Sequence, residues 1–486
     1  MFNMSNVRQA VIFSSASRYL LRLIGLISTM VIARLLTPGE IGTFAIASAI
    51  VMIMSEFRLL GAGAYIVREK ELTESKVASA LGLTVLISWG LGLIVFFSAS
   101  LVAEFYGIPD VENIFRILSI SFFLAPYISI PTAVLQRVYQ FKTLFIIKVF
   151  ATVVGLLSTV SLILLDFSFY ALALGHTLII GVEFILIALF WPENTPWRPQ
   201  FRGLKPVASV GIYSSMANLL KKATVTVPDM VIGKMGTITQ VGIFSRGLGL
   251  AEFLSQSLMM GINPVALPYL SETKRTGGDI SWAYIRASVL LGGLVWPVLA
   301  VASMASLPVI RLFFGGQWDE AAPLATWLAV WAMLRSTHWL SNSVLLASGK
   351  EKIMVAKELI VFIVFFISII LAFPYGLESI AIAFVLASVW DLLVSSMVLK
   401  KTINLGFVQF LRAWWPNLAV SGVCWFVTYL ISQVVSFESD NYWLPILTIG
   451  LVMPPVWILS LKIFSHPLYI ELSGVLKSIL GKFVSK

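Results

Sequence analysis

Long apolar segments alternate with short polar ones along the whole chain. A helix needs about 20 mainly apolar residues to cross the hydrocarbon core of a bilayer, and only helices or closed barrels satisfy their backbone groups there. The pattern therefore predicts an all-α integral membrane protein with about fourteen transmembrane helices. The expected spans lie near residues 10–35, 41–60, 78–103, 113–135, 143–165, 168–191, 207–232, 240–267, 284–310, 321–347, 354–373, 377–399, 409–436 and 443–463.

The segment around residues 14–44 recurs 200 positions later, at 214–244. Two homologous halves in so apolar a chain predict a transporter built of two lobes around a central site. Six expected spans precede the second copy, and an even number makes the two halves parallel in the membrane, related by an axis along its normal. The stretches that align are 14–22 with 214–222, 31–37 with 231–237, and 41–44 with 241–244.

The repeat and the Pro-containing segment between its copies divide the chain into four parts. We expect an N-terminal lobe at 1–191 with spans 1–6, and a cytoplasmic linker at 192–206. A C-terminal lobe follows at 207–399 with spans 7–12. Residues 400–486 hold two extra spans, which have no partner in the repeat, and a basic cytoplasmic tail.

The charges of the loops predict an orientation. Loops after the even-numbered spans are rich in Lys and Arg, whereas the opposite loops are acidic or nearly uncharged, with Lys234 and Arg311 as exceptions. Basic loops stay in the cytoplasm, so both termini are expected there. The basic loops carry Arg68 and Lys70, Arg137 and Lys142, Arg198, Arg202 and Lys205, Lys274 and Arg275, Lys350 and Lys352, and Lys400 and Lys401.

Composition agrees with this class and excludes others. The chain is 58% hydrophobic and only 12% charged, far from the balance of a soluble protein. Residues 9–35 form an expected retained span, since no signal-peptide cleavage site follows. The single cysteine, Cys424, excludes an intrachain disulfide, and the three histidines lack metal-ligand spacing. We expect no metal and no cofactor. The net charge of +10 is assigned to cytoplasmic loops, not to nucleic-acid binding.

Several charges fall inside expected spans, where each costs roughly 2.5–3.5 kcal/mol at the bilayer centre. Arg22 and Lys222 are repeat equivalents, so both lobes place a cation at one depth. Lining an aqueous cavity explains them better than facing lipid, although snorkelling to the cytoplasmic interface is the alternative. The stripe on span 1 consists of Ser14, Arg18, Arg22, Gly25 and Thr29. The stripe on span 7 consists of Ser214, Asn218, Lys222 and Asp229, with Lys221 beside it.

Two further spans carry polar faces. In span 8, Ser245, Gly249, Glu252 and Gln256 share a face, and Arg246 is adjacent. In span 10 the face consists of Trp327, Trp331, Arg335, His338 and Asn342. Indoles pack on sugars and the arginine fork binds phosphate. The alternative is a Trp-rich surface facing lipid, with Arg335 buried against a neighbour.

These faces define the predicted substrate-binding residues: Arg18, Arg22, Asn218, Lys221, Lys222, Arg246, Trp327, Trp331, Arg335 and His338. Asp229 and Glu252 are candidates for a coupling ion. His176 and Glu183 share a face of span 6, and they and Asp391 are further acids or bases for a proton or sodium site. Glu56 and Arg58 are expected to form a surface ion pair. No residue is predicted to be catalytic.

The stretch Ile32–Phe44 resembles the first-loop signature of the polysaccharide transporter family, and Leu59–Thr73 resembles that family's segment after span 2. This Wzx-type family belongs to the multidrug/oligosaccharidyl-lipid/polysaccharide exporter superfamily. The resemblance implies a V-shaped fold that alternates between inward-open and outward-open states. It implies a flippase for undecaprenyl-diphosphate-linked oligosaccharides in the bacterial inner membrane, which serves O-antigen or exopolysaccharide synthesis. Membrane lipid, a polysaccharide polymerase and export machinery are the implied partners.

Three other functions are weighed against this one. A multidrug exporter of the same superfamily needs an acidic cavity for cationic drugs, but span 1 carries Arg18 and Arg22 and no acid between Arg8 and Glu40. A lipid II flippase also has fourteen spans and a basic cavity, but the loop signatures favour the polysaccharide branch. An enzyme such as a ligase or polymerase is disfavoured, because no large outer loop and no nucleophile–base pattern occurs.

Overall fold

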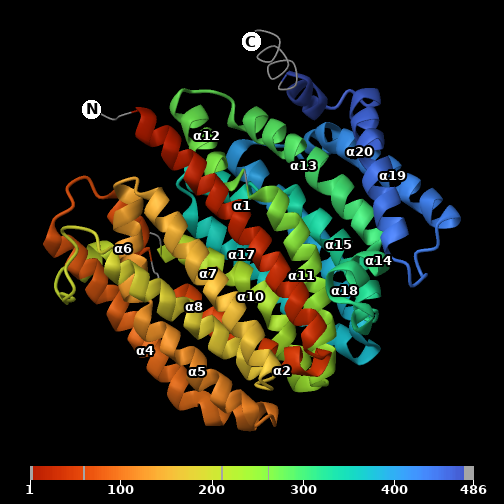
Figure 1. Ribbon diagram of the computed structural model, residues 1–486. Coiled ribbons are helices and arrows are strands. Elements are labelled where there is room, and N and C mark those ends of the chain that lie inside the picture. The colour runs from red at the N-terminus through yellow and green to blue at the C-terminus, as the bar shows by residue number, and fades with distance from the viewer. Residues whose placement is uncertain (1–3, 59–60, 210–211, 261, 475–486) are drawn as a thin grey trace, which may run out of the picture. The chain divides into compact units, whose positions relative to one another are not determined.

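The computed structural model describes the chain apart from residues 1–3, 59–60, 210–211, 261 and 475–486, and every regular element in the described part is a helix (Figure 1). Among the described residues, ten helices are long and apolar enough to cross a membrane, or eleven if the bent pair α5–α6 is counted as one span. The predicted all-α, multi-pass membrane protein is therefore confirmed. The last part of the expected basic tail, from residue 475, lies outside the described residues.

The chain separates into two compact units, Met1–Ser245 and Arg246–Lys486. The first contains α1 (Met4–Leu35), α2 (Pro38–Phe57), α3 (Ala62–Arg68), α4 (Glu74–Tyr106), α5 (Asp110–Leu124), α6 (Pro126–Arg137), α7 (Phe141–Leu164), α8 (Tyr170–Leu189), α9 (Leu204–Ser209), α10 (Ile212–Met235) and the start of α11 (Ile238–Met259).

The second unit contains the rest of α11 and the helices that follow. These are α12 (Asn263–Arg275), α13 (Ile280–Met304), α14 (Ser306–Phe314), η1 (Gly316–Trp318), α15 (Ala321–Thr337), α16 (Ser341–Ala347), α17 (Glu351–Ala372), η2 (Phe373–Tyr375), α18 (Leu377–Ile403), α19 (Phe407–Val434) and α20 (Trp443–Ile463). The division falls within α11, so the predicted lobe boundary at 192–206 stays a prediction.

Once the bent pair α5–α6 is counted as a span, three expected spans still correspond to helices outside the apolar set: α10, α11 and α15. These helices carry most of the polar and charged residues predicted for the site, such as Lys221, Lys222 and Glu252. Polar side chains lower mean hydropathy, so a helix that lines an aqueous cavity is harder to recognise as a span than one that faces lipid. The count of fourteen spans stays a prediction.

The repeat is reproduced in local structure at the starts of α2 and α11. Thr37 accepts from the Glu40 amide at 3.3 Å, while the Thr37 amide donates to the Glu40 carboxylate at 2.8 Å. At the equivalent position, Thr237 and Gln240 form the same pair of bonds at 3.2 and 2.9 Å. This Thr-x-x-Glu/Gln arrangement is a capping box, which satisfies two amides at a helix start. The 200-residue repeat therefore fixes where both helices begin.

The segment between α8 and α9 is held on the first unit. Trp191 and Trp197 stack with ring centroids 3.6 Å apart, and the Gln200 amide donates to the Ala78 carbonyl at 2.9 Å. Gly82 lets this segment approach α4, because a Cβ at that position would lie 2.1 Å from the Gln200 carbonyl oxygen. Part of the predicted linker is therefore ordered and lies against α4.

Both exceptions to the loop-charge pattern have local partners. Lys234 donates to the carbonyl of Phe105, and its Nζ lies 4.3 Å from the centre of the Phe105 ring. Arg311 pairs with Asp319 at 2.7 Å and donates to the carbonyls of Glu438 and Ser439 at 3.0 Å. The hydrogen bond to Asp319 raises the pKa of Arg311. A cation satisfied in this way does not weaken the orientation that the other loops indicate.

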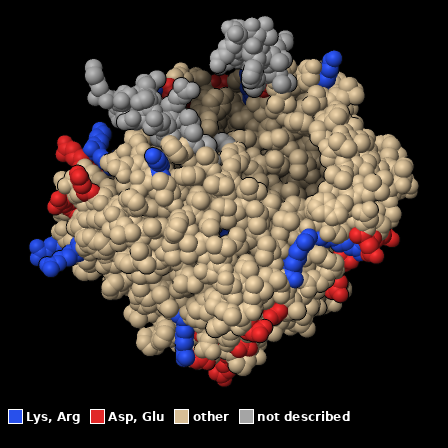
Figure 2. Space-filling view, viewed as in Figure 1, with Lys and Arg blue, Asp and Glu red and all other residues tan. Residues whose placement is uncertain are grey.

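The surface agrees with a membrane environment. In the face drawn in Figure 2, few Lys, Arg, Asp and Glu side chains interrupt a surface formed almost entirely of uncharged residues. Large apolar side chains that would be unfavourable in water are exposed on these helices, for example Phe97, Leu189 and Leu451 at 71–76%. Such a surface is stable against lipid tails.

Candidate functional site

Most of the predicted basic residues of the first unit lie on two helices. Arg18 and Arg22 are on α1, and Lys221 and Lys222 are on α10, all half-buried, while Asn218 is exposed. Helix α1 packs mainly on α7, and α10 packs mainly on α2. The two stripes therefore occupy two helix pairs of one unit. The side chain of Ser14 lies outside the described residues, and Asp229 is half-buried on α10, one residue after Pro228.

Glu252 and Arg335 of the second unit form an ion pair between α11 and α15. Gln256 donates to the same carboxylate, and the Arg335 guanidinium lies 5.0 Å from the centre of the Trp331 ring. A paired carboxylate and guanidinium neutralise each other, so in this conformation neither offers a bare charge to an ion or a phosphate. Glu252 as a coupling-ion site and Arg335 as a phosphate ligand both require this pair to open.

The Trp-rich face of span 10 is divided by packing. Trp331 is fully buried and meets Phe384 edge to face at 5.4 Å. Trp327 is half-buried, and its Nε1 donates to Glu378 at 3.0 Å. Trp331 therefore belongs to the core in this conformation. Of the two indoles, only that of Trp327 is partly exposed and able to contact a substrate. Both remain predictions as sugar contacts.

His338 is held inside the second unit. Its Nδ1 lies 2.8 Å from the Tyr284 hydroxyl and its Nε2 lies 2.8 Å from the Ser396 hydroxyl. Only 7% of the residue is exposed. Because both ring nitrogens have partners in α13 and α18, His338 ties three helices together in this conformation. Contact with a substrate would require these helices to separate.

Arg246 is half-buried at the start of the second unit. Its guanidinium lies 5.4 Å from the Trp318 ring and 5.6 Å from the Phe314 ring. Two aromatic faces near a cation hold it by cation–π attraction. The predicted phosphate role of Arg246 is compatible with this placement and stays a prediction.

A buried ion pair was not predicted from the sequence. Lys357 and Glu358 lie 2.9 Å apart with 4% and 7% of their side chains exposed. Asn342 donates to Glu358 at 2.9 Å, and Lys357 donates to Ser341 at 3.2 Å. The signal was present: two adjacent opposite charges two turns into an otherwise apolar helix. Such a pair survives burial only when its remaining hydrogen bonds are satisfied, as they are here.

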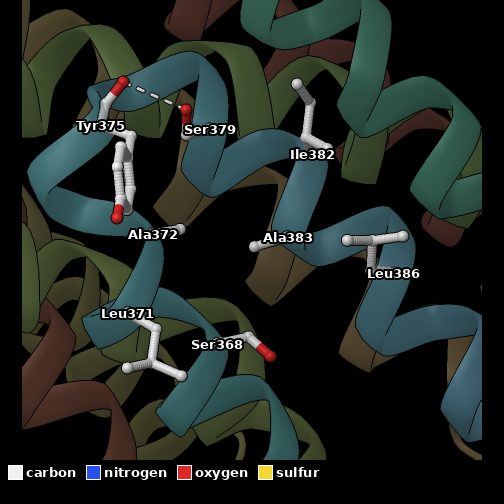
Figure 3. A pocket seen from close by; sticks show the side chains of 8 residues that line it. All are labelled: Ser368, Leu371, Ala372, Tyr375, Ser379, Ile382, Ala383 and Leu386. Carbon is white, nitrogen blue, oxygen red and sulfur yellow. Dashed lines mark hydrogen bonds between the residues drawn. The ribbon is translucent and has the colours of Figure 1, made fainter.

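Two cavities of the second unit contain none of the predicted residues. One, of about 340 Å³, is an open groove at the turn between α17 and α18, lined mainly by apolar side chains, with Ser379 donating to the Tyr375 carbonyl at 3.0 Å (Figure 3). The other, also about 340 Å³, lies between α13, α19 and α20 and is lined by Cys424, Met453, Trp457 and apolar neighbours. No charged side chain lines either cavity.

The described residues hold no cluster of three or more His, Cys, Asp or Glu side chains that suits a metal ion. The free thiol of Cys424 is buried.

The fold matches solved membrane transporters. A lipid II flippase, MurJ, in an inward closed conformation, superposes with a TM-score of 0.71 over 95% of this chain and 99% of that one, at 16% identity. A multidrug resistance transporter of the MATE family in an inward-facing conformation gives 0.61 over 81% and 99%, at 12% identity. At such identities the likeness concerns the fold, which is that of a membrane transporter.

Sequence relatives name polysaccharide pathways. The teichuronic acid biosynthesis protein TuaB of Bacillus subtilis is 24% identical over 73% of this chain and 74% of its own length. The lipopolysaccharide biosynthesis protein WzxC of Escherichia coli is 20% identical over 85% of each chain. The family profile described as polysaccharide biosynthesis protein matches residues 31–323, more than half of the sequence. The chain is therefore a member of this polysaccharide biosynthesis protein family, as the two motifs in Ile32–Phe44 and Leu59–Thr73 predicted.

Proposed function

We propose that this protein moves undecaprenyl-diphosphate-linked oligosaccharide repeat units across the bacterial inner membrane for the synthesis of O-antigen or an exopolysaccharide. Family membership supports a role in polysaccharide synthesis, and the transporter fold supports movement of a substrate over its chemical conversion. The names of TuaB and WzxC point to teichuronic acid and lipopolysaccharide. The lipid-linked repeat unit is the substrate that joins a membrane transporter to such pathways.

The half-buried cations of α1 and α10 are the observation that carries this proposal. Arg18, Arg22, Lys221 and Lys222 are half-buried on two helices that we take as spans, where a charge facing lipid would be costly. A diphosphate offers the opposite charge and several acceptor oxygens. A cationic drug would be repelled by the same residues, so the multidrug exporter remains the less favoured alternative. A lipid II flippase shares the diphosphate chemistry and is distinguished by experiment.

The mechanism follows from these charges. The diphosphate binds the cations of the first unit from the cytoplasm, while the polyprenyl tail stays in the hydrocarbon phase. The protein then changes from an inward-open to an outward-open state, and the substrate drives this change by the difference in its affinity for the two states. Fourteen spans, two parallel six-helix lobes and cytoplasmic termini complete the proposed topology. A polysaccharide polymerase and export machinery are the proposed partners.

Mass spectrometry of the lipids of a strain that lacks this protein tests the proposal. We expect an undecaprenyl-diphosphate oligosaccharide to accumulate and a surface polymer to be lost. Accumulation of lipid II instead would assign the alternative flippase activity. An unchanged lipid pool, with new sensitivity to cationic dyes, would contradict the proposal and favour a drug exporter.

A further inference from the structure

Four ionisable side chains of the first unit lie on or next to three helices, of which α8 packs on α7 and also contacts α2. Arg58 follows the end of α2, Lys148 is in α7, and His176 and Glu183 are in α8. The charge of Glu183 acts on Arg58, that of Lys148 acts on Glu183, and that of Arg58 acts on His176. His176 and Glu183 are seven residues apart, so they share one face of their helix.

These side chains keep unused hydrogen-bonding capacity. Among the residues that the structure describes, Arg58, Lys148, His176 and Glu183 make no side-chain hydrogen bond or ion pair, and Arg58 Nε is buried without a partner. The expected surface ion pair between Glu56 and Arg58 is not formed, although the charge of Glu56 acts on Arg58. A polar atom such as Arg58 Nε, withdrawn from water without a partner, is unfavourable. A ligand that supplies the partners is therefore favoured here.

The second unit has a related set of charges, whose side chains have hydrogen-bond and ion-pair partners within the protein. Asp391 in α18 corresponds to Glu183 in α8 when Ala381 is aligned with Ala173, and its charge acts on Lys357. There, however, Lys357 is paired with Glu358, Asn342 donates to Glu358, and Ser395 donates to Asp391 at 3.0 Å. The two repeats thus place an acid on their last helix and a lysine on the preceding one. Only the second satisfies its lysine with side chains of its own.

The charges of this cluster balance when the neighbouring Glu56, whose charge acts on Arg58, is counted with it. Arg58 and Lys148 carry two positive charges, and Glu56 and Glu183 carry two negative ones. A balanced set gives no net attraction to an anion, but it offers both donors and acceptors. Sugar hydroxyls each donate and accept, so a hydroxyl-rich neutral group uses such a set fully.

We propose that Arg58, Lys148, His176 and Glu183 form a saccharide-binding site in the first unit, which receives a neutral sugar of the lipid-linked unit. The Arg58 fork and the Lys148 ammonium donate to sugar oxygens, and Glu183 accepts from sugar hydroxyls. The exposed His176 extends the site along the face of α8. This inference rests on the proposed function and adds to it a position for the sugar, separate from the cations assigned to the diphosphate.

Isothermal titration calorimetry on the detergent-solubilised full chain tests the site. The first probe is the free oligosaccharide, released by mild acid from the lipid-linked material that accumulates in the deletion strain. The second probe is inorganic pyrophosphate. The variants are Arg58→Gln and Glu183→Gln, with Arg116→Gln as the matched control, because Arg116 is an arginine of the same unit that pairs with Glu112 on α5.

We expect both site variants to bind the oligosaccharide at least about tenfold more weakly, since each loses charge-assisted hydrogen bonds. Pyrophosphate binding stays unchanged in both, and Arg116→Gln behaves as wild type with both probes. Unchanged oligosaccharide binding in both site variants overturns the inference. So does a pattern in which Arg58→Gln weakens and Glu183→Gln strengthens pyrophosphate binding, because the site would then bind an oxyanion.

Failure of the proposed function gives a different result. If the deletion strain accumulates no lipid-linked oligosaccharide, the transport proposal fails, and the saccharide site fails with it. If the oligosaccharide accumulates but binds wild type and both site variants equally, transport stands and only the saccharide site is refuted. A folding defect is recognised because it also reduces pyrophosphate binding and lowers the melting temperature relative to Arg116→Gln.

Discussion

Gly42 and Gly242, 200 positions apart in the repeat, each lie against the backbone of the other's helix start. A Cβ on Gly42 would lie 1.9 Å from the carbonyl oxygen of Ile238, and one on Gly242 would lie 2.0 Å from that of Pro38. Ile238 and Pro38 are themselves repeat equivalents. The contact is therefore reciprocal, as expected when two copies of one element pack around a local two-fold axis. Both residues belong to the first unit.

Gly42→Ala is expected to destabilise the protein. The added methyl group overlaps a main-chain carbonyl that has no rotamer to change, and overpacking of this kind costs about 1–3 kcal/mol. The apparent melting temperature in detergent should fall by several degrees. Gly90→Ala is the control, since nothing lies within 4 Å of its added Cβ and alanine favours a helix. Equal melting temperatures for the two variants would refute the close contact.

Arg311→Gln should loosen the loop between α19 and α20. Arg311 joins Asp319 to the carbonyls of Glu438 and Ser439, and its side chain is 17% exposed. Loss of these charge-assisted bonds should cost about 1–3 kcal/mol, seen as faster limited proteolysis at residues 435–442. Arg275→Gln is the comparison, because its pair with Glu272 is exposed and worth about 0–1 kcal/mol. Identical cleavage rates would contradict this role.

His466 should make the C-terminal end of α20 sensitive to acid. It is fully buried beside Gly293 and bonds Asn417 at 2.8 Å and the Leu468 amide at 3.0 Å. Burial lowers the pKa of His466 to about 4, below its ordinary value of about 6.5. Between these values the undocked form binds a proton that the docked form excludes. Docking is therefore complete above pH 6.5 and weakens as the pH falls toward 4, by roughly 3 kcal/mol in total.

Hydrogen exchange of residues 461–470 at pH 7.5 and pH 5 measures this effect. Wild type should exchange faster at pH 5. The variant His466→Gln has no titrating ring, so its exchange, corrected for the intrinsic rate, should depend little on pH. The same pH dependence in the variant and in wild type would assign the effect to another group.

Removal of single cations should test the proposed diphosphate contacts. We expect Arg18→Ala or Lys222→Ala to abolish polymer export, because each variant removes a charge-assisted contact to the diphosphate. Immunoblots of the membrane fraction should show unchanged protein. Arg116→Ala, which removes an outer cation of the same unit, should export normally. Normal export in both single variants and in the double variant would refute the proposed contacts of Arg18 and Lys222 with the diphosphate.

The membrane potential should assist transport. An inside-negative potential favours outward movement of an anion by about 2.3 kcal/mol per charge per 100 mV. A diphosphate with about two charges gains roughly 4–5 kcal/mol. Collapse of the potential at constant pH gradient should therefore slow movement of the lipid-linked unit from the outer, cytoplasmic face of inverted membrane vesicles to their lumenal face. Export that does not respond would point to coupled transport through Asp229 or Glu252 instead.

The sequence was most informative where apolar patterning and local hydrogen bonding decide the structure. Spans such as α4, α7 and α17 were placed correctly because their residues face lipid or core almost throughout. The Thr-Pro-Gly-Glu and Thr-Ile-Thr-Gln segments fixed the starts of α2 and α11, since a capping box needs only neighbours in the chain. The polar helices α10, α11 and α15 were expected as spans but do not meet the apolar pattern of the other helices.

The partners of the candidate site residues were beyond the sequence. A helical face shows that Arg335, His338 and Trp331 point in similar directions, but not what they meet. Glu252, which pairs with Arg335, lies on another helix. Tyr284 and Ser396, which hydrogen-bond His338, lie on two further helices. Such pairings depend on how helices pack, which a periodic pattern on one helix does not contain.

By itself, the sequence determined that this chain is a helical membrane protein with an internal repeat, belongs to a polysaccharide biosynthesis family, and carries cations inside apolar spans. The membrane class, the repeat and the intramembrane cations follow from composition, periodicity and local spacing, and the family follows from the resemblance of Ile32–Phe44 and Leu59–Thr73 to its motifs. Only the tertiary structure decided which of its charges are already satisfied. It paired Lys357 with Glu358 and gave the side chains of Arg58 and Glu183 no hydrogen-bond partner among the described residues, because the cost of a buried charge is set by neighbours from distant segments.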